Sequence, residues 1–309
     1  MTRDIKALLI GGSGFIGSSL CTALLQHGCT PVIYDRVKPE RDDVTFVPGD
    51  ISTIAEQLPS LIQGVDVIYH LAWSTKPASA NINPADDLSS NVLPGLKFLE
   101  VLAQQHKVPR LVFISSGGVV YGDVDTLPVQ EDHPTNPIGA YGTSKLAYEH
   151  YLHVFHKLHN LDYMIFRPGN PFGPGHHTDT RQGVIDVFLR KMMTGDKIEV
   201  WGDGSVVRDY IFIDDLVSGL IKAIAYRPGS ESSRIFNLGS GIGISVRELV
   251  AKLEDVSGMK ADVEYLPERD FDVKQIALDC RAARSQLGWE NTTDLESGIR
   301  QTYEWLLNK

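Results

Sequence analysis

The amino-acid sequence predicts an α/β fold, in which a doubly wound parallel sheet is followed by a smaller mixed α/β domain. Short strands that are apolar throughout alternate with helices over the first half, which is typical of a parallel sheet covered on both faces. A glycine-rich turn joins the first strand to the first helix. After Pro168 the texture changes to a loop rich in Gly, Pro and His. We therefore expect a first domain over 1–168 and a second over 169–309, with segments near 211–240 returning to the first.

The individual elements follow from apolar runs and helical periodicity. The expected strands are 6–12, 30–35, 44–50, 65–72, 110–115 and 161–168. The expected helices are 15–28, 53–63, 91–106 and 141–159, with an amphipathic helix over 297–308 at the end of the chain.

Composition narrows the class of protein. The chain has 309 residues, and 42% of them are hydrophobic, which argues against a disordered protein. The formal net charge of -10 argues against a nucleic acid as the main partner. The three cysteines, Cys21, Cys29 and Cys280, form no CxxC pair, as expected in a reducing compartment. The amino terminus enters a strand almost at once and no apolar stretch reaches the length of a membrane span. We expect a cytoplasmic protein with no membrane association.

The first βα turn has the spacing of a dinucleotide-binding, Rossmann-type turn. Gly11 permits the tight turn, Gly14 lets the backbone approach a pyrophosphate, and Gly17 lets the helix pack on the strand. Asp35 ends the second strand, where a carboxylate holds a ribose 2'-hydroxyl and repels a 2'-phosphate. A glycine-rich turn without a ligand is the simpler alternative. Arg36 could pair with a 2'-phosphate, but Asp35 favours NAD over NADP.

Tyr141 and Lys145 lie four residues apart, on one face of an expected helix. A phenol with its usual pKa of about 10 is a poor base at neutral pH. A neighbouring ammonium and a nicotinamide cation stabilise its phenolate, which makes tyrosine a general base for an alcohol. Alone, this spacing is often a surface pair; after a dinucleotide turn it predicts an oxidoreductase-type site.

Together these features resemble the extended short-chain dehydrogenase/reductase superfamily. The resemblance rests on the glycine turn, "GD" at 49–50, "HLA" at 70–72, "SSGGVVYG" at 115–122 and the Tyr–Lys pair. The motifs "RPGNPFGP" at 167–174, "GDGSVVRDYIFIDD" at 202–215 and "RDFD" at 269–272 resemble its nucleotide-sugar branch, nearest to UDP-glucose 4-epimerases.

The resemblance implies a role for each matching position. The cofactor residues it implies are Gly11, Gly14, Phe15, Ile16, Gly17, Asp35, Arg36, Asp50, Ile51, Leu71, Ala72, Asn91, Ser115, Tyr141, Lys145 and Pro168. The substrate residues it implies are Thr75, Ser116, Gly117, Asn170, Trp201, Arg208, Arg269 and Asp272. Arginines suit a diphosphate because each offers two donors, although single arginines are usually surface charges. Trp201 could lie in the core or face the uracil, and we favour the uracil.

The sequence departs from the epimerase pattern at the third catalytic group. A hydroxyl that contacts the reacting sugar oxygen is expected four residues before Tyr121, where this chain has Gly117. Ser116 is the candidate replacement, because the paired glycines could let the backbone turn it into place; Ser74 or Thr75 are substitutes. On this hypothesis a serine at 117 would replace the hydroxyl of Ser116. In the epimerase pattern, the residue four positions beyond Asp272 limits the space beside the sugar. Here it is Ile276, which is intermediate in size, so we expect some tolerance for an N-acetyl group.

The predicted activity is epimerisation at C4 of a UDP-hexose through a 4-keto intermediate, with Tyr141, Lys145 and Ser116 as the catalytic residues. The gluco, N-acetyl and uronic substrates remain open. The alternatives are a nucleotide-sugar 4-keto reductase or dehydrogenase, and a dinucleotide-sensing protein that has lost catalysis. No metal is expected, because His176 and His177 lie in a stretch rich in Gly and Pro with no third ligand at helical spacing.

The resemblance also implies a homodimer. Its helices over 91–106 and 141–159 would pair across a two-fold axis into a four-helix bundle. Their apolar residues Leu96, Leu99, Leu146 and Leu152 are the expected contacts.

Overall fold

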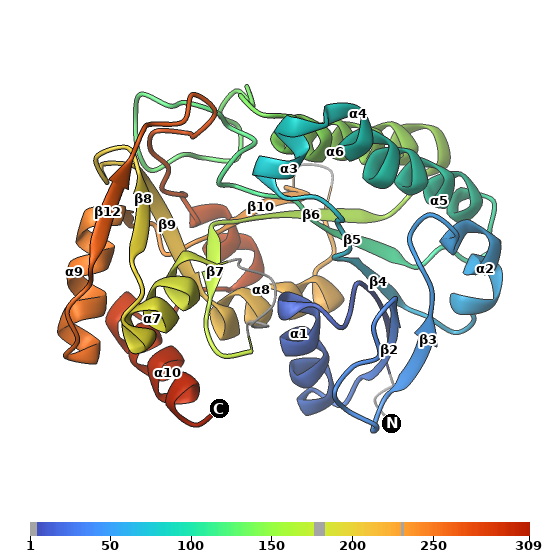
Figure 1. Cartoon of the computed structure of the whole chain (residues 1–309). Coiled ribbons are helices and arrows are strands. Elements are labelled where there is room, and N and C mark those ends of the chain that lie inside the picture. The colour runs from blue at the N-terminus through green and yellow to red at the C-terminus, as the bar shows by residue number, and fades with distance from the viewer. Residues whose placement is uncertain (1–4, 176–182, 230–231) are drawn as a thin grey trace.

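A seven-stranded parallel sheet forms the centre of the larger part of the molecule (Figure 1). The computed structural model describes residues 5–175, 183–229 and 232–309. The strand order is β10 (Ile235–Leu238), β6 (Tyr163–Pro168), β5 (Arg110–Ile114), β4 (Val67–His70), β1 (Lys6–Ile10), β2 (Thr30–Asp35) and β3 (Thr45–Pro48). Every adjacent pair is parallel. The order changes direction between β1 and β4, which opens a crevice at the carboxyl ends of the strands.

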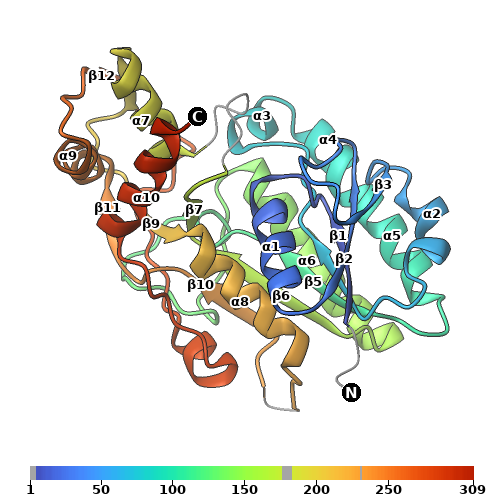
Figure 2. The ribbon, with the colours of Figure 1, turned by 90° about the horizontal axis from the view of Figure 1, so that it is seen from below.

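Helices cover both faces of this sheet, as the doubly wound prediction requires. Figures 1 and 2 show α1 (Phe15–Gln26) and α8 (Ile213–Ala225) on one face, and α5 (Leu93–Ala103) and α6 (Ala140–His159) on the other, with α2 (Ile54–Leu61) beside α5. Side chains alternate along β1, so that Ala7 and Leu9 pack into the α1–α8 core and Leu8 and Ile10 into the core beneath α5 and α6.

The chain between β4 and α5 is more broken than the sequence predicts. Two short helices, α3 (Pro77–Ile82) and α4 (Pro84–Asp87), and a π-helical turn over Leu88–Val92 precede α5. Pro94 is the second residue of α5, directly after the π-helical turn, and because it has no N–H it cannot donate an intrahelical bond back into that turn.

The smaller part lies beyond the carboxyl ends of the large sheet, at the left of Figure 1. It contains a three-stranded sheet, ordered β11 (Gly243–Ser245), β9 (Val207–Phe212) and β7 (Asn170–Phe172), and a parallel pair of β12 (Val263–Leu266) with β8 (Ile198–Trp201). Around them pack α7 (Val184–Thr194), α9 (Val246–Ser257) and α10 (Leu295–Leu307), and a second π-helical turn spans Ala283–Leu287. Although they come after β7 in the chain, α8 and β10 lie in the layers of the large sheet.

None of the helices in the described ranges is long and apolar enough to cross a membrane.

Asp209, in β9, connects three separate segments of the chain. Its carboxylate is fully buried and accepts hydrogen bonds from Ser240 N (2.7 Å), Gly241 N (3.1 Å) and Leu278 N (2.9 Å). The Ser240 hydroxyl donates a further bond of 2.7 Å. A buried acceptor with four donors fixes the loop after β10 and the segment at 278 against β9.

Replacing this carboxylate should destabilise the whole protein. Asp209→Asn presents an amide N–H₂ to buried N–H donors, so we expect the free energy of unfolding to fall by about 3 kcal/mol. Urea denaturation measures the change. Asp255→Asn, at an exposed position on α9, is the control and should change stability little. Equal effects of the two substitutions would show that the Asp209 bonds are not important for stability.

Candidate active site

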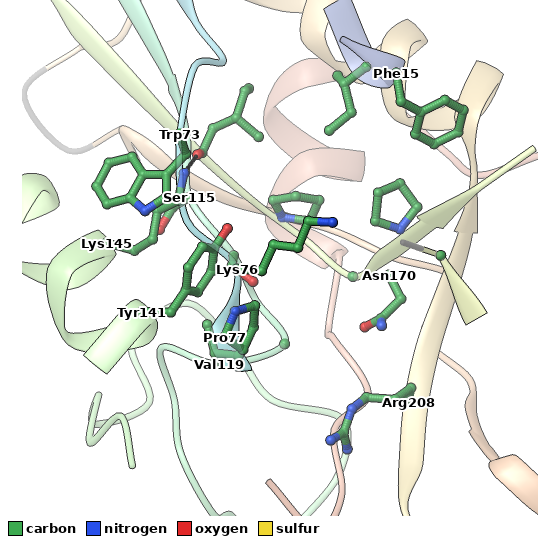
Figure 3. Close-up of a pocket in the computed structure, with 18 of the residues that line it drawn as sticks. Phe15, Trp73, Lys76, Pro77, Ser115, Val119, Tyr141, Lys145, Asn170 and Arg208 are labelled. Carbon is green, nitrogen blue, oxygen red and sulfur yellow. Dashed lines mark hydrogen bonds between the residues drawn. The ribbon is translucent and has the colours of Figure 1, made fainter. Parts of the chain in front are cut away.

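A cavity of about 470 Å³ opens where β1, β4, β5 and β6 end. A second hollow of about 380 Å³ adjoins it, and Asn170, Arg208, Tyr210 and Asp272 line both. Figure 3 shows Tyr141, Lys145, Trp73 and Ser115 grouped on one wall of the cavity, and Asn170 and Arg208 on the other. One continuous space therefore runs from the large sheet to the smaller part of the molecule.

The glycine turn has the shape of a pyrophosphate cradle. Gly11 has φ +86°, and a Cβ there would lie 2.6 Å from Ala72 N. A Cβ on Gly17 would lie 2.5 Å from Gly11 O, so this glycine is needed for close packing of α1. A Cβ on Gly14 would meet only Gly11 O, at 3.6 Å, and would otherwise occupy cavity space. Phe15, Ile16 and Gly17 begin α1 at the cavity wall, so the helix N-terminus faces an anion bound there.

The residues expected at the adenosine end lie beside the turn, at the ends of β2 and β3. Asp35 Oδ2 accepts a bond from Ser13 N (3.0 Å), and its Oδ1 accepts one from Val37 N (3.1 Å). Arg36 is exposed, and its Nε lies 3.5 Å from Asp50 Oδ2. Hydrogen bonds from Ser52, and more weakly the charge of Arg36, lower the pKa of Asp50. A 2'-phosphate would compete with Asp50 for Arg36. Ile51 packs against the core beneath α5 and α6.

Tyr141 and Lys145 occupy the first two turns of α6 and both line the cavity. Lys145 is buried and its Nζ donates a 2.8 Å bond to Ile114 O at the end of β5. Burial lowers the pKa of Lys145 to about 7, against the opposing charges of Glu149 and Asp87. Burial, with a smaller effect of Asp87, raises the pKa of Tyr141 above its usual value. The protein environment alone therefore favours a neutral phenol.

A buried ion pair lies behind this wall. Glu149 and Arg167 are each 4% exposed, with Arg167 Nη2 2.6 Å from Glu149 Oε2 and Nε donating to both carboxylate oxygens. The Ser115 hydroxyl donates to Glu149 Oε1, and Arg167 Nη1 donates to Tyr121 OH (3.0 Å). Ser115 lies in the lining of the cavity, but its hydroxyl is directed toward Glu149. These bonds fix α6 against β5 and β6.

Asn91 is not among the residues that line the cavity, although the resemblance implies that it contacts the cofactor. It is buried, and its Nδ2 donates to Thr75 Oγ1 (3.0 Å) and to Asp87 O (2.9 Å), while its Oδ1 accepts from Ser74 N (2.7 Å). Thr75 Oγ1 also donates to Asp87. The polar atoms of Asn91 thus hold the loop after β4, and Ser74 and Thr75 are the members of this group that line the cavity.

The two glycines after Ser116 face opposite ways. A Cβ on Gly117 would lie 2.6 Å from Leu278 Cδ1 and 3.0 Å from Arg167 O, so this position is directed into the protein. The expectation that a serine at 117 would supply the cavity hydroxyl is wrong for this steric reason. A Cβ on Gly118 would lie 3.4 Å from Asn170 Oδ1 and 3.9 Å from Ser116 Oγ, both ordinary contacts. Ser116 and Gly118 both line the cavity.

The second hollow brings together the residues expected to hold a nucleoside diphosphate. Arg269 pairs with Asp272 (Nη2–Oδ2 2.6 Å), and its guanidinium lies 5.0 Å from the centre of the Trp201 ring. Trp201, which lies partly exposed at the end of β8, lines this hollow and is not a core residue. Arg208 Nη1 donates to Val273 O (2.5 Å), which directs its side chain along the shared wall.

Some residues singled out in the sequence do not line the cavity, and some residues that line it were not singled out. Ile276 is fully buried in a small cluster with Leu278 and Val129, so it does not limit sugar space directly. His176 and His177 lie outside the described residues, within which no group of three or more His, Cys, Asp or Glu could hold a metal. The cavity lining also includes residues that the sequence did not identify, among them an aromatic, a cation and a second glycine: Trp73, Lys76 and Gly118. Their position directly after β4 and β5 was the available signal.

The carboxylate of Asp35 should determine which dinucleotide binds. For Asp35→Asn we expect the preference for NAD over NADP, measured by calorimetry, to fall roughly ten- to hundredfold, because a charge-assisted bond is lost and repulsion of the phosphate is relieved. Arg36→Gln is the comparison: its guanidinium is directed to Asp50, so the preference should change little. A large loss of NADP binding in Arg36→Gln alone would mean that Arg36, not Asp35, distinguishes the two.

Comparison with known proteins identifies the family. Residues 7–239 match the NAD dependent epimerase/dehydratase family. A UDP-glucose 4-epimerase of Mycolicibacterium smegmatis is 33% identical, over 99% of each chain. A dTDP-4-dehydro-6-deoxyglucose reductase of Escherichia coli is 32% identical, over 96% of each chain. A UDP-glucose 4-epimerase of Thermus thermophilus, solved in complex with NAD, superposes with a TM-score of 0.90 at 28% identity, covering 98% of this chain and 99% of the other.

The match covers both the glycine cradle and the Tyr–Lys wall, and the doubly wound sheet has the same fold as the solved epimerase. The chain therefore belongs to the NAD-dependent epimerase/dehydratase family, and its cofactor is NAD.

Proposed function

We propose that this protein is a nucleotide-sugar 4-epimerase that interconverts the C4 epimers of a UDP-hexose. The observation that carries the proposal is the single space shared by the glycine cradle, Tyr141 with Lys145, and the hollow lined by Arg208 and Arg269. A UDP-sugar whose diphosphate contacts the arginines would reach the Tyr141 wall with its hexose. The relative in Mycolicibacterium smegmatis supports this substrate class.

In this proposal, different residues carry out proton transfer, cofactor binding and nucleotide binding. Tyr141 takes the proton of the sugar 4-hydroxyl, and Lys145 stabilises the phenolate and binds the nicotinamide ribose. When bound, NAD supplies a reversible hydride acceptor. Arg208, Arg269 and Asp272 hold the nucleotide, so that the sugar can turn while the diphosphate remains in place.

One assay separates this activity from the alternatives. The purified protein, incubated with UDP-glucose or UDP-galactose and no added reductant, should give the other epimer, with Tyr141→Phe as the inactive control. A 4-keto reductase, which the relative in Escherichia coli favours as the second candidate, would consume NADH in proportion to product. Binding of NAD without turnover of any UDP-hexose would indicate the dinucleotide sensor. UDP-N-acetyl and UDP-uronic sugars extend the test to the remaining substrates.

The hydroxyl of Ser116 should assist proton transfer at the 4-oxygen. Ser116→Ala is expected to lower kcat by roughly ten- to ten-thousandfold with little change in NAD affinity. Adding Gly118→Ser should restore part of the rate, because a side chain there fits beside Ser116 Oγ. Adding Gly117→Ser should not, because it collides with Leu278.

Ser60→Ala, on the surface of α2, is the control for loss of a serine hydroxyl. Wild-type kcat in Ser116→Ala would assign the hydroxyl a structural role.

We also propose that two chains form a homodimer through α5 and α6. Of the residues expected at the contact, Leu99 and Leu152 are fully buried beneath these helices and cannot reach a partner. Other apolar residues occupy the outer surface of α6: Tyr151, Val154 and Leu158, with Leu158 71% exposed. Their spacing of three and four residues places them in one stripe on one side of the helix.

Charge on this stripe should separate the dimer. The double substitution Val154→Glu and Leu158→Glu is expected to give a monomer by light scattering at micromolar concentration, since it buries like charges across a two-fold axis. Ile242→Glu, at an exposed apolar residue away from α6, should leave the dimer intact. A monomeric wild-type protein would contradict the proposal.

A further inference from the structure

We propose that Trp73 is a positioning residue whose indole face holds the ammonium of Lys145 in its charged form beside Tyr141. The inference rests on the proposed roles of Tyr141 and Lys145. It assigns a function to a loop residue that the glycine turn and the Tyr–Lys spacing do not predict.

Aromatic rings surround the Lys145 ammonium within the active-site wall. Its Nζ lies 4.0 Å from the centre of the Trp73 ring, 4.8 Å from that of Phe113 and 5.8 Å from that of Tyr141. A cation within about 6 Å of a ring centre is attracted to the negative face of the ring, most strongly for Trp. Figure 3 shows the indole of Trp73 beside Lys145 and above Tyr141.

The place of Trp73 is determined by its ring. Its Nε1 is buried and has no hydrogen-bond acceptor in the described part of the chain, although a buried indole N–H usually has one. Its ring makes an edge contact with Tyr141 (6.3 Å between centres) and a tilted one with Phe113 (5.9 Å). The indole of Trp73 is therefore held by ring contacts, with its face toward Lys145, and not by a hydrogen bond of its N–H.

The surroundings of Lys145 make this contact important for its charge. Burial lowers the pKa of Lys145 to about 7, so small interactions decide whether it is charged at neutral pH. Of the groups that face it, Glu149 and Asp87 favour the charged form, and Glu149 is already paired with Arg167. His70, whose pKa burial lowers to about 3, and Tyr148 are neutral. The rings of Trp73 and Phe113 add their attraction without bringing in a titratable group.

Loss of the Trp73 ring should raise the pKa of Tyr141. Removing the indole face makes Lys145 lose its proton at lower pH, and a neutral Lys145 no longer stabilises the phenolate. The pKa of Tyr141 then rises, because the phenolate loses the positive charge beside it.

The experiment is an ultraviolet titration of the NAD-loaded protein, following phenolate absorbance near 295 nm with the Tyr141→Phe spectrum subtracted. In Trp73→Leu, we expect the midpoint of Tyr141 ionisation to move up by roughly half to one and a half pH units. In the matched variant Trp73→Phe, which keeps an aromatic face, we expect a smaller movement. Identical midpoints in all three proteins would overturn the inference.

A second measurement keeps the test independent of how well the leucine variant folds. Fluorinated tryptophans placed at position 73 keep the shape of the indole and weaken the negative face stepwise. The midpoint should rise with each added fluorine, and a constant midpoint would overturn the inference. The titration needs no sugar, so absence of epimerase activity would contradict the proposed function and leave the result for Trp73 unaffected.

Discussion

The buried ion pair between Glu149 and Arg167 is the interaction on which the geometry of the active-site wall depends. Glu149 lies one turn after Lys145 on α6, and Arg167 lies in β6, so their contact fixes the helix relative to the sheet. Because both charges are out of water, removal of either leaves an uncompensated buried charge, which is far more costly than loss of a surface pair. The carboxylate also accepts the Ser115 hydroxyl, which orients the strand end from which Ser116 reaches the cavity.

The topology of the sheet explains why chemistry gathers at this wall. Strands β1, β4, β5 and β6 are parallel neighbours, so their carboxyl ends meet at one edge and each following loop enters the same space. The smaller part covers that edge with β7 and β9, which supply Asn170 and Arg208. Asp209, next to Arg208, binds the loops around it through four donors and so holds the nucleotide side of the cavity in place.

The sequence predicted those features that short-range rules control. The positions of the strands and helices of the large sheet follow from apolar runs and periodicity, and the four-residue spacing of Tyr141 and Lys145 places them on one helix face. The sequence did not predict the direction in which a side chain points where that direction depends on tertiary contacts. Gly117 has no Cβ to reveal its orientation, and only the position of Leu278, far along the chain, shows that it faces inward. The resemblance implies that Leu99 and Leu152 lie at a dimer surface, but both are fully buried, because periodicity does not show which of two apolar stripes on a helix meets the sheet.

The charge balance of the wall connects these physical details to the proposed reaction. Burial raises the pKa of Tyr141 and lowers that of Lys145, so the dry wall opposes both the phenolate and the ammonium. A base can therefore exist there only where other groups compensate: the ring faces and Glu149 keep Lys145 charged, and Lys145 in turn stabilises the phenolate. A bound, oxidised nicotinamide would add a further positive charge beside Tyr141. Tyr141 would thus become basic when a hydride acceptor is beside it, and this couples proton removal to hydride removal in both directions of an epimerisation.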